Sequence, residues 1–170
     1  KTELSVIPHV DSHGDDIHIR LLNRDELEAN ETLLNQVFTL LIDAHYRTSP
    51  LDLARLLDAP NMRIWVASQG EMITGVSLVA EEGGLSQAMA EHVSIGERRL
   101  KGHLLPQTMC AHMGFMPAAT QIAWRIVRIA VAKSHRRQGI GGRLMDAVET
   151  EAKAVQVDYL GAAFGAVVAL

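Results

Sequence analysis

Cysteine and aromatic residues are scarce in this chain. Its 170 residues include one cysteine, Cys110, and aromatic residues make up 4% of the sequence. A single cysteine excludes an internal disulfide and is typical of a protein that folds in a reducing compartment. Eight histidines are scattered along the chain without paired cysteines, so the sequence does not support a zinc site and we expect no bound metal.

Long hydrophobic runs are also absent, although 48% of the residues are hydrophobic. No run approaches the roughly 20 apolar residues of a membrane-spanning helix, and the N-terminal part lacks a secretion signal. We therefore expect a cytoplasmic protein with no membrane partner. Length favours a single domain over residues 1–170, with residues 1–15 as a poorly defined lead-in. The chain begins at Lys1 rather than Met, which indicates a piece of a longer protein.

Acidic residues are missing from one long block of the sequence. Residues 98–145 contain no Asp or Glu and nine Lys or Arg, whereas residues 1–97 carry a net charge of −10 and residues 146–170 a net charge of −3. Basic side chains form charge-assisted hydrogen bonds to phosphate and attract polyanions. The block therefore favours a phosphate-rich ligand. The alternative is a solvated face whose charge is balanced in space by the acidic half.

Hydrophobic periodicity predicts a layered α+β or α/β fold. Residues 17–22 alternate like an edge strand, and Asn23 opens a helical stretch that continues to Ala44. The further expected elements, in chain order, are a short helix in 49–60, two strands joined around Gln69–Gly70, helical patches in 86–93 and 104–113, a strand in 121–132, an amphipathic helix in 140–154 and a last strand after 157.

The most informative stretch is RIAVAKSHRRQGIGGRL, residues 128–144. An apolar strand ends there in a basic loop, and Gly139, Gly141 and Gly142 lie where the next helix begins. Backbone N–H groups are unpaired at a helix N-terminus, the helix dipole adds positive charge, and glycines let an anion approach closely. The spacing Arg-x-x-Gly-x-Gly is neither a P-loop nor Gly-x-Gly-x-x-Gly, which disfavours a nucleoside triphosphate or a dinucleotide.

In this context the loop resembles the pyrophosphate loop of the GNAT acetyltransferases. The resemblance implies the GNAT acyl-CoA N-acyltransferase fold, a mixed central sheet flanked by helices, with acetyl-CoA as co-substrate. It also implies that the backbone of Ile129, Ala130 and Val131 pairs with the pantetheine arm. The residues implied to cradle the pyrophosphate are Arg136, Arg137, Gln138, Gly139, Ile140, Gly141 and Gly142.

Four segments extend the resemblance: LLIDAHYRTSPLDLARLLDAP, EEGGLS, ERRLKGHLLPQTM and WRIVRIAV. Together, over roughly residues 33–165, they resemble the acetyltransferase part of the bacterial tRNA(Met) cytidine acetyltransferases. The resemblance implies N4-acetylation of the wobble cytidine of elongator tRNA(Met), with tRNA as partner. It also implies an upstream module driven by ATP or GTP and an RNA-binding tail, neither of which this chain contains.

The sequence departs from the GNAT pattern in two places. GNAT domains continue past the fifth strand into a helix and two strands, whereas this chain ends at Leu170, so we expect the C-terminal part of the fold to be missing or divergent. In addition, Ala132, Lys133 and Ser134 stand where His-Pro is common, so no role of that histidine is carried over.

The sequence does not identify a catalytic base, which cytosine N4 needs because it loses a proton as it attacks. The candidates, each of which also suits a capping, packing or surface role, are His45, His103, His112, Glu81 and Glu82. Cys110 lies in an apolar helical setting and is expected to be a buried structural thiol. Arg98, Arg99 and Lys101 lie outside the cofactor loop, and we expect them to face RNA.

Two other functions stay open at this point. A stand-alone GNAT enzyme that acetylates a small amine or a protein N-terminus would share the glycine loop, but not the AHYRTSP and GHLLPQ segments. A non-catalytic module that binds acyl-CoA or RNA would bind its ligands without transferring the acetyl group. The oligomeric state cannot be read from the sequence.

Overall fold

The computed structural model describes residues 17–43 and 49–163, apart from the side chains of Pro50, Asp52 and Leu56. Its centre is a five-stranded sheet in the order β1-β2-β3-β4-β5, in which β1 to β4 are antiparallel and β5 runs parallel to β4. The strands are β1 (Ile17–Leu21), β2 (Met62–Gln69), β3 (Met72–Gly83), β4 (Ile122–Val131) and β5 (Tyr159–Ala162). The sheet is mixed and flanked by helices, which confirms the expected fold class.

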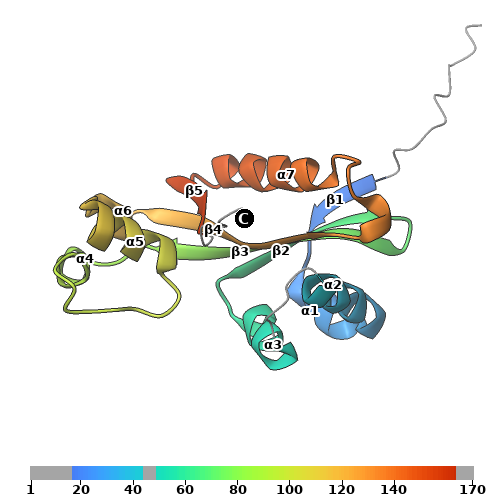
Figure 1. Ribbon diagram of the computed structural model, residues 1–170, viewed down its shortest axis with the longest axis horizontal. Helices are drawn as coiled ribbons and strands as arrows, with labels where there is room; N and C mark the ends of the chain where they lie inside the picture. The colour runs from blue at the N-terminus through green and yellow to red at the C-terminus, as the bar shows by residue number, and fades with distance from the viewer. Residues whose placement is uncertain (1–16, 44–48, 164–170) are drawn as a thin grey trace, which may run out of the picture.

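Helices cover both faces of the sheet (Figure 1). On one face lie α1 (Arg24–Ala29), α2 (Glu31–Asp43) and α3 (Pro50–Asp58); on the other lies α7 (Ile140–Ala154). Each layer buries its own apolar cluster, because successive strand residues point to opposite faces. Val66 and Leu78 pack towards α2, while Trp65 and Val79 pack towards α7.

Gly75 on β3 sets how closely α7 approaches the sheet. A Cβ atom at this position would lie 2.9 Å from Ile140 Cγ2 and 3.0 Å from Leu144 Cδ1, closer than side chains normally pack. The first two turns of α7 therefore rest directly on the backbone of β3. This contact fixes the start of α7 beside the end of β4.

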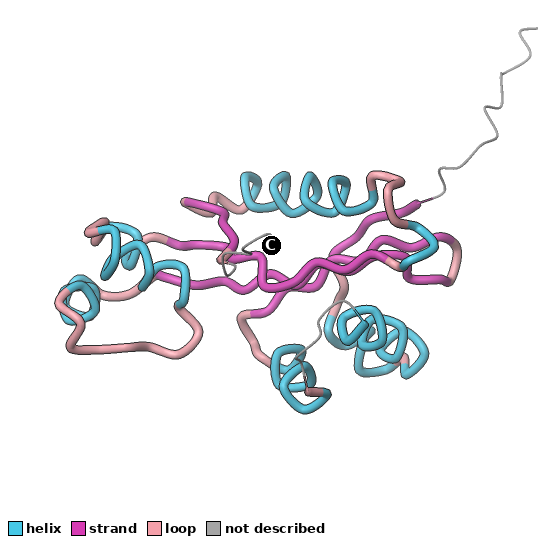
Figure 2. The backbone as a smooth tube through the Cα atoms, in the orientation of Figure 1, coloured by secondary structure: helices cyan, strands magenta, loops and turns pink. Residues whose placement is uncertain are grey.

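Residues between β3 and β4 form a helical insert of three short helices. These are α4 (Gln87–Ser94), α5 (Leu104–Met113) and α6 (Pro117–Thr120). They pack around a small core that contains Ala90, Val93, Cys110 and Ala119. The Cys110 thiol is buried as expected, and its burial raises its pKa. Figure 2 shows the insert as a group of helices and loops beyond one end of the strands.

One expected element is divided in two. The sequence predicts a continuous helical stretch from Asn23 to Ala44, whereas α1 ends at Ala29 and α2 begins at Glu31. Asn30 separates them in an extended conformation, with φ −120° and ψ 93°. Its side-chain oxygen accepts a hydrogen bond from Leu33 N at 3.0 Å. An Asn side chain competes with helical hydrogen bonding in this way and caps the next helix instead.

The other expected elements are confirmed. The edge strand is β1, and β2 and β3 form the hairpin, in which Gly70 has a φ of +59°. The long strand is β4, and the amphipathic helix spans Ile140–Ala154 as predicted. The short helix α6 was not predicted from the sequence. Residues 164–170, which bear on the expected C-terminal divergence, lie outside the described residues.

Candidate functional site

The edge of β4 that faces away from β3 is covered over only part of its length. β5 pairs with β4 from Ala123 to Ile126, and no described strand continues that pairing towards Val131. An exposed strand edge presents a row of N–H and C=O groups that an extended, amide-containing ligand can pair with.

A β-bulge lies where the uncovered edge begins. Leu78 pairs with Arg128 and Val79 pairs with Ile126, so Val127 is an extra residue without a partner on β3. Bulges redirect backbone groups and side chains next to functional sites. Beyond this point, Ile129 is 37% exposed and Val131 is half-buried on the α7 side of the sheet. A Cβ atom on Gly141 would lie 3.9 Å from both of their side chains.

The loop from β4 to α7 is held by its own hydrogen bonds. A short 3₁₀ turn, Lys133–His135, follows the strand, and His135 N donates to Ala132 O at 2.9 Å. His135 Nε2 lies 3.2 Å from Gln69 Oε1, which connects the loop to the β2–β3 hairpin. Arg137 and Gly139 both have positive φ, +64° and +76°. The loop is therefore a defined turn rather than an extended linker.

The first turn of α7 is open to a ligand. Its N-cap residue is Gly139, and no side chain caps the helix. Arg143 N donates to Gly139 O at 3.0 Å, but the structure gives no acceptor in the described chain for the N–H groups of Ile140, Gly141 and Gly142. A Cβ atom on Gly139 or Gly142 would meet nothing within 4 Å. Unpaired N–H groups, the helix dipole and the absence of side chains are together the features that suit an anion.

All ten residues predicted to bind the cofactor come together at this end of the sheet. They are Ile129, Ala130, Val131, Arg136, Arg137, Gln138, Gly139, Ile140, Gly141 and Gly142. Ile140 and Ala130 can offer only backbone groups to a ligand, because their side chains are buried in opposite apolar clusters. The combination suits a ligand with a phosphate group at one end and an extended amide-containing arm along β4.

A buried ion pair lies near the other end of β4. Glu82 Oε1 accepts from Arg125 Nε at 2.7 Å, and the two side chains are 0% and 15% exposed. Glu82 Oε2 accepts from Leu105 N at 2.9 Å, in the first turn of α5. His103 Nδ1 accepts from Gly83 N at 2.9 Å. The carboxylate thus replaces the missing side-chain cap of α5 and joins the insert to β3 and β4.

The structure shows how the candidate bases are engaged. Both oxygens of Glu82 are occupied, as described above. Glu81 Oε2 accepts from Arg63 Nη2 at 3.0 Å and from Trp124 Nε1 at 3.2 Å, and the Arg63 hydrogen bond is the main cause of its lowered pKa. Because His103 Nδ1 is an acceptor, its neutral ring carries the proton on Nε2. His112 is exposed on the insert, and His45 lies outside the described residues.

Eight of the nine Lys and Arg residues of the basic block fall into three groups, and the ninth, Arg128, is half-buried on β4. Arg125 and Arg143 are engaged within the fold, the first with Glu82 and the second through Nη2 to Ile17 O at 2.7 Å. An exposed group at the glycine loop contains Lys133, Arg136 and Arg137. An exposed group on the loop between α4 and α5 contains Arg98, Arg99 and Lys101. The two exposed groups lie at opposite ends of β4.

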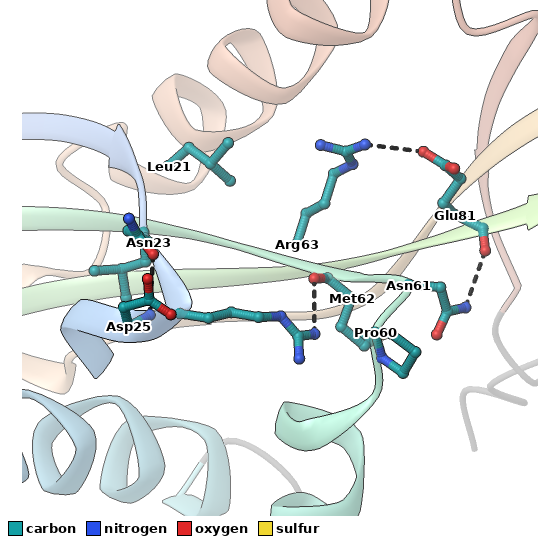
Figure 3. Close-up of a pocket in the computed structure, with 10 residues that line it drawn as sticks. Leu21, Asn23, Asp25, Pro60, Asn61, Met62, Arg63 and Glu81 are labelled. Atoms are coloured by element: carbon teal, nitrogen blue, oxygen red, sulfur yellow. Dashed lines mark hydrogen bonds and ion pairs between the residues drawn. The ribbon is translucent and has the colours of Figure 1, made fainter. Parts of the chain in front are cut away.

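Figure 3 shows a pocket of about 460 Å³ where β1 ends and β2 begins. Its polar groups mostly bind one another: Arg63 pairs with Glu81, and Asn61 Nδ2 donates to Glu81 O at 2.9 Å. Arg24 donates to backbone carbonyls, including Met62 O at 3.2 Å. This arrangement is a structural junction between the first helices and the sheet. In the described part of the chain, no three His, Cys, Asp or Glu side chains converge to hold a metal, and no helix there is long and apolar enough to cross a membrane.

Sequence reasoning missed three features of the site. The Glu82–Arg125 pair joins residues 43 positions apart, the bulge at Val127 depends on strand pairing, and the role of Leu105 N depends on how the insert docks. No local pattern reveals any of these. Only the GHLLPQ segment, which contains His103 and Leu105, drew attention to the right place.

An uncapped helix start beside a partly uncovered strand in a mixed sheet is the arrangement expected of the acyl-CoA N-acyltransferase folds. The chain matches the family described as GNAT acetyltransferase 2 over residues 36–151, more than half of its length. The chain therefore belongs to this family, as the glycine loop led us to expect.

Sequence relatives make the match more specific. A tRNA(Met) cytidine acetyltransferase TmcA from Pectobacterium atrosepticum is 46% identical over 149 residues, which is 88% of this chain and 21% of the relative. A protein of the same name from Haloferax volcanii is 38% identical over 156 residues, 92% of this chain and 20% of the relative. The resemblance expected from the four quoted segments is confirmed. The chain spans about a fifth of the length of these relatives.

Solved structures agree on the fold. A GNAT family acetyltransferase from Staphylococcus aureus has a TM-score of 0.54 at 18% identity, covering 91% of this chain and 93% of that one. The aminoglycoside N-acetyltransferase AAC(6')-Iy, solved in complex with CoA, has a TM-score of 0.55 at 13% identity, covering 94% and 82%. These likenesses confirm a GNAT fold.

Proposed function

We propose that this chain is the acetyl-CoA-binding part of an N-acetyltransferase that acetylates cytidine N4 in tRNA. The observation that carries the cofactor half of the proposal is the uncovered edge of β4 beside the uncapped, glycine-lined start of α7. The names of the relatives carry the acceptor half. In the same proposal, the wobble cytidine of elongator tRNA(Met) is the target and the cytoplasm is the site of action.

Acetyl-CoA fits the residues that are present. The N–H groups of Gly141 and Gly142 suit its pyrophosphate, with Arg136 and Arg137 as exposed cations nearby. The backbone of Ile129 and Val131 suits the amides of its pantetheine arm. When bound, acetyl-CoA supplies an activated acetyl group as a thioester.

The chain's own contribution to the chemistry is positioning and charge stabilisation. The bulge at Val127 leaves backbone groups outside the β3 ladder. A backbone N–H directed at a carbonyl oxygen that gains negative charge is typically worth about 3 kcal/mol. The acceptor amine must also lose a proton. Glu81, Glu82 and His103 are already engaged in hydrogen bonds within the fold, and the remaining described candidate, His112, lies on α5 of the insert. The proposed function therefore assigns no residue as the base.

The first test is calorimetric titration of the chain with acetyl-CoA. Gly141→Glu places a carboxylate at the start of α7 and should abolish binding. Gly141→Ala is the matched control, since a Cβ atom makes only 3.9 Å contacts there and φ is not positive at this glycine. Binding by the alanine variant with none by the glutamate variant supports the cofactor site. Equal binding by both variants would overturn it.

The second test is acetyl transfer to tRNA by the longest form of the protein that its gene encodes. N4-acetylcytidine in purified tRNA(Met), absent from the Gly141→Glu variant, is the expected product. Acetylation of small amines or of a protein N-terminus instead would identify a stand-alone GNAT enzyme. Binding of both ligands without transfer would identify a non-catalytic module. The resemblance also implies a module driven by ATP or GTP in the longer protein, so the assay should include each nucleotide.

A further inference from the structure

A second pocket, of about 510 Å³, lies in the helical insert at the end of the sheet opposite the glycine loop. The end of α4, the following loop and one side of α5 line this insert pocket. Its volume lies within the roughly 300–1,000 Å³ of small-ligand sites. Its ionisable side chains are Arg98, Arg99 and His112, with no carboxylate among them. By contrast, the pocket in Figure 3 includes Asp25 and Glu81.

Apolar side chains lie beside these cations and are exposed. Ile95, the C-cap residue of α4, is 67% exposed, and Leu104, the first residue of α5, is 50% exposed. Both line the insert pocket. Unpaired nucleotides have an apolar base face and an anionic phosphate, and proteins hold them with apolar side chains, guanidinium planes and basic groups. The chemistry of the pocket matches both halves of such a ligand.

The walls of the insert pocket are held in place by hydrogen bonds. The side-chain amide of Gln107 on α5 forms two hydrogen bonds with the backbone of Leu100. Its Oε1 accepts from Leu100 N at 2.8 Å, and its Nε2 donates to Leu100 O at 2.6 Å. The same Nε2 lies 2.9 Å from His103 O. Because Leu100 stands between Arg99 and Lys101, this contact fixes the basic loop against α5. A preformed wall reduces the entropy lost when a ligand binds.

The insert pocket is also tied to the strand that carries the proposed acetyl-transfer site. Glu82 joins Leu105, in the first turn of α5, to Arg125 on β4. A Cβ atom on Gly161 of β5 would lie 2.8 Å from Leu105 Cδ2, so α5 rests closely on β5 as well. A group bound in the pocket would therefore keep a constant position relative to the bulge in β4.

We propose that the insert pocket binds one unpaired nucleotide of the acceptor RNA loop, a different nucleotide from the one that is acetylated. Its base lies against Ile95 and Leu104, and its phosphate is held by Arg98 and Arg99. This inference rests on the proposed function, because it takes the acceptor to be an RNA loop. It adds a second point of contact, which would select RNA with an unpaired loop over double-stranded RNA.

The test is fluorescence anisotropy of the chain with two labelled RNAs, an anticodon stem–loop and a fully paired duplex of equal length. Ile95→Asn should weaken binding of the stem–loop about fivefold, a loss typical of one buried apolar contact, and leave duplex binding unchanged. Val155→Asn is the matched control: Val155 is also a C-cap residue, on α7, and is 49% exposed. Its variant should bind both RNAs like the unmodified chain.

Charge is tested separately. Arg99→Glu should weaken stem–loop binding about tenfold at moderate salt, because a phosphate contact is replaced by repulsion. Lys153→Glu makes the same change of charge on the exposed face of α7 and should have little effect. All four variants should bind acetyl-CoA normally, and thermal unfolding followed by tryptophan fluorescence shows that they remain folded.

The outcomes separate the two proposals. Stem–loop binding that Ile95→Asn and Arg99→Glu leave unchanged would overturn the insert pocket as a nucleotide site, while RNA as the acceptor would stand. If the unmodified chain bound no RNA at all, the insert pocket would not be a nucleotide site. Acetyl-CoA binding would still support the cofactor site. Equal weakening of duplex and stem–loop by Ile95→Asn would also contradict a site for an unpaired base.

Discussion

The two ends of β4 differ in the kind of group that each could offer to an anion. At the glycine end, backbone N–H groups of α7 are uncapped and glycines leave them open. At the insert end, the cations belong to side chains on a loop that Gln107 fixes in place. Both ends belong to one block of sequence without acids. The comparison teaches that one basic block can present positive groups in two separate places, from backbone N–H groups in one and from side chains in the other.

The largest expected effect is at the ion pair that joins the insert to the sheet. Glu82→Ala leaves the Arg125 charge buried without its partner and Leu105 N without an acceptor. Breaking a buried ion pair by removing one partner destabilises a fold by about 3–5 kcal/mol. We expect a loss of this size in the free energy of unfolding, measured in urea by the fluorescence of Trp65 and Trp124, both of which are buried.

Glu149→Ala is the control for this variant. Glu149 pairs with Lys153 at 2.6 Å on the surface of α7, where both side chains are more than half exposed. Exposed pairs of this kind contribute little to stability, because water and salt screen them, so we expect only a small loss. Similar losses for the two variants would mean that Glu82 does not join the insert to the sheet in the way the geometry indicates.

The next largest effect on stability is expected at Gln107, which holds the loop of the insert pocket against α5. Gln107→Ala removes three hydrogen bonds to backbone groups of Leu100 and His103. We expect a loss of about 2 kcal/mol in stability, together with weaker stem–loop binding and unchanged acetyl-CoA binding. Gln107→Glu keeps the acceptor for Leu100 N and should retain part of the stability. A Gln107→Ala variant that loses acetyl-CoA binding instead would show that the two ends are not independent.

Two glycines at the cofactor end should respond with opposite signs. Gly139 has a φ of +76°, so Gly139→Ala should destabilise the fold by about 1 kcal/mol. Gly142 lies in the first turn of α7 with open space around it, so Gly142→Ala should stabilise the fold by up to about 1 kcal/mol. Urea unfolding of both variants measures the difference. The same sign for both would contradict the described loop conformation.

The smallest expected effect is a dependence of the unfolding free energy on alkaline pH, which Tyr159 causes near the insert. Tyr159 of β5 donates through its hydroxyl to Ala118 O of α6 at 2.8 Å. Burial, with the nearby charge of Glu82, raises the pKa of Tyr159 from 10.0 to about 12. Because the folded pKa is the higher one, its contribution to stability is complete below pH 10 and is lost as the pH rises from 10 towards about 12.

Tyr159→Phe tests this dependence. Unfolding free energies of the variant and the unmodified chain, measured at pH 8 and at several values above pH 10, should differ most at pH 8 and converge as the pH rises. The hydrogen bond itself should be worth about 1 kcal/mol at pH 8. A difference that is constant with pH would show that Tyr159 titrates normally in the folded protein.

Local patterns were sufficient for most of the fold. The apolar alternation of β1, the Gly70 turn and the amphipathic face of α7 each gave the correct element. Two places were exceptions: the short helix α6 was not predicted, and the Asn30 side chain could belong to a helix or cap one, which the packing of α1 and α2 decided.

By itself, the sequence determined the family and the glycine-rich turn between β4 and α7, because glycine adopts the positive φ of Gly139 that local sterics disfavour in other residues. It also determined that the acid-free block would be strongly basic, since charge is a property of composition. Only the tertiary structure decided that Arg125 is a buried partner of Glu82 and that Arg98 and Arg99 lie at the opposite end of β4 from the loop. These facts depend on contacts between residues 20 to 43 positions apart, which form only when the strands pair and the insert docks.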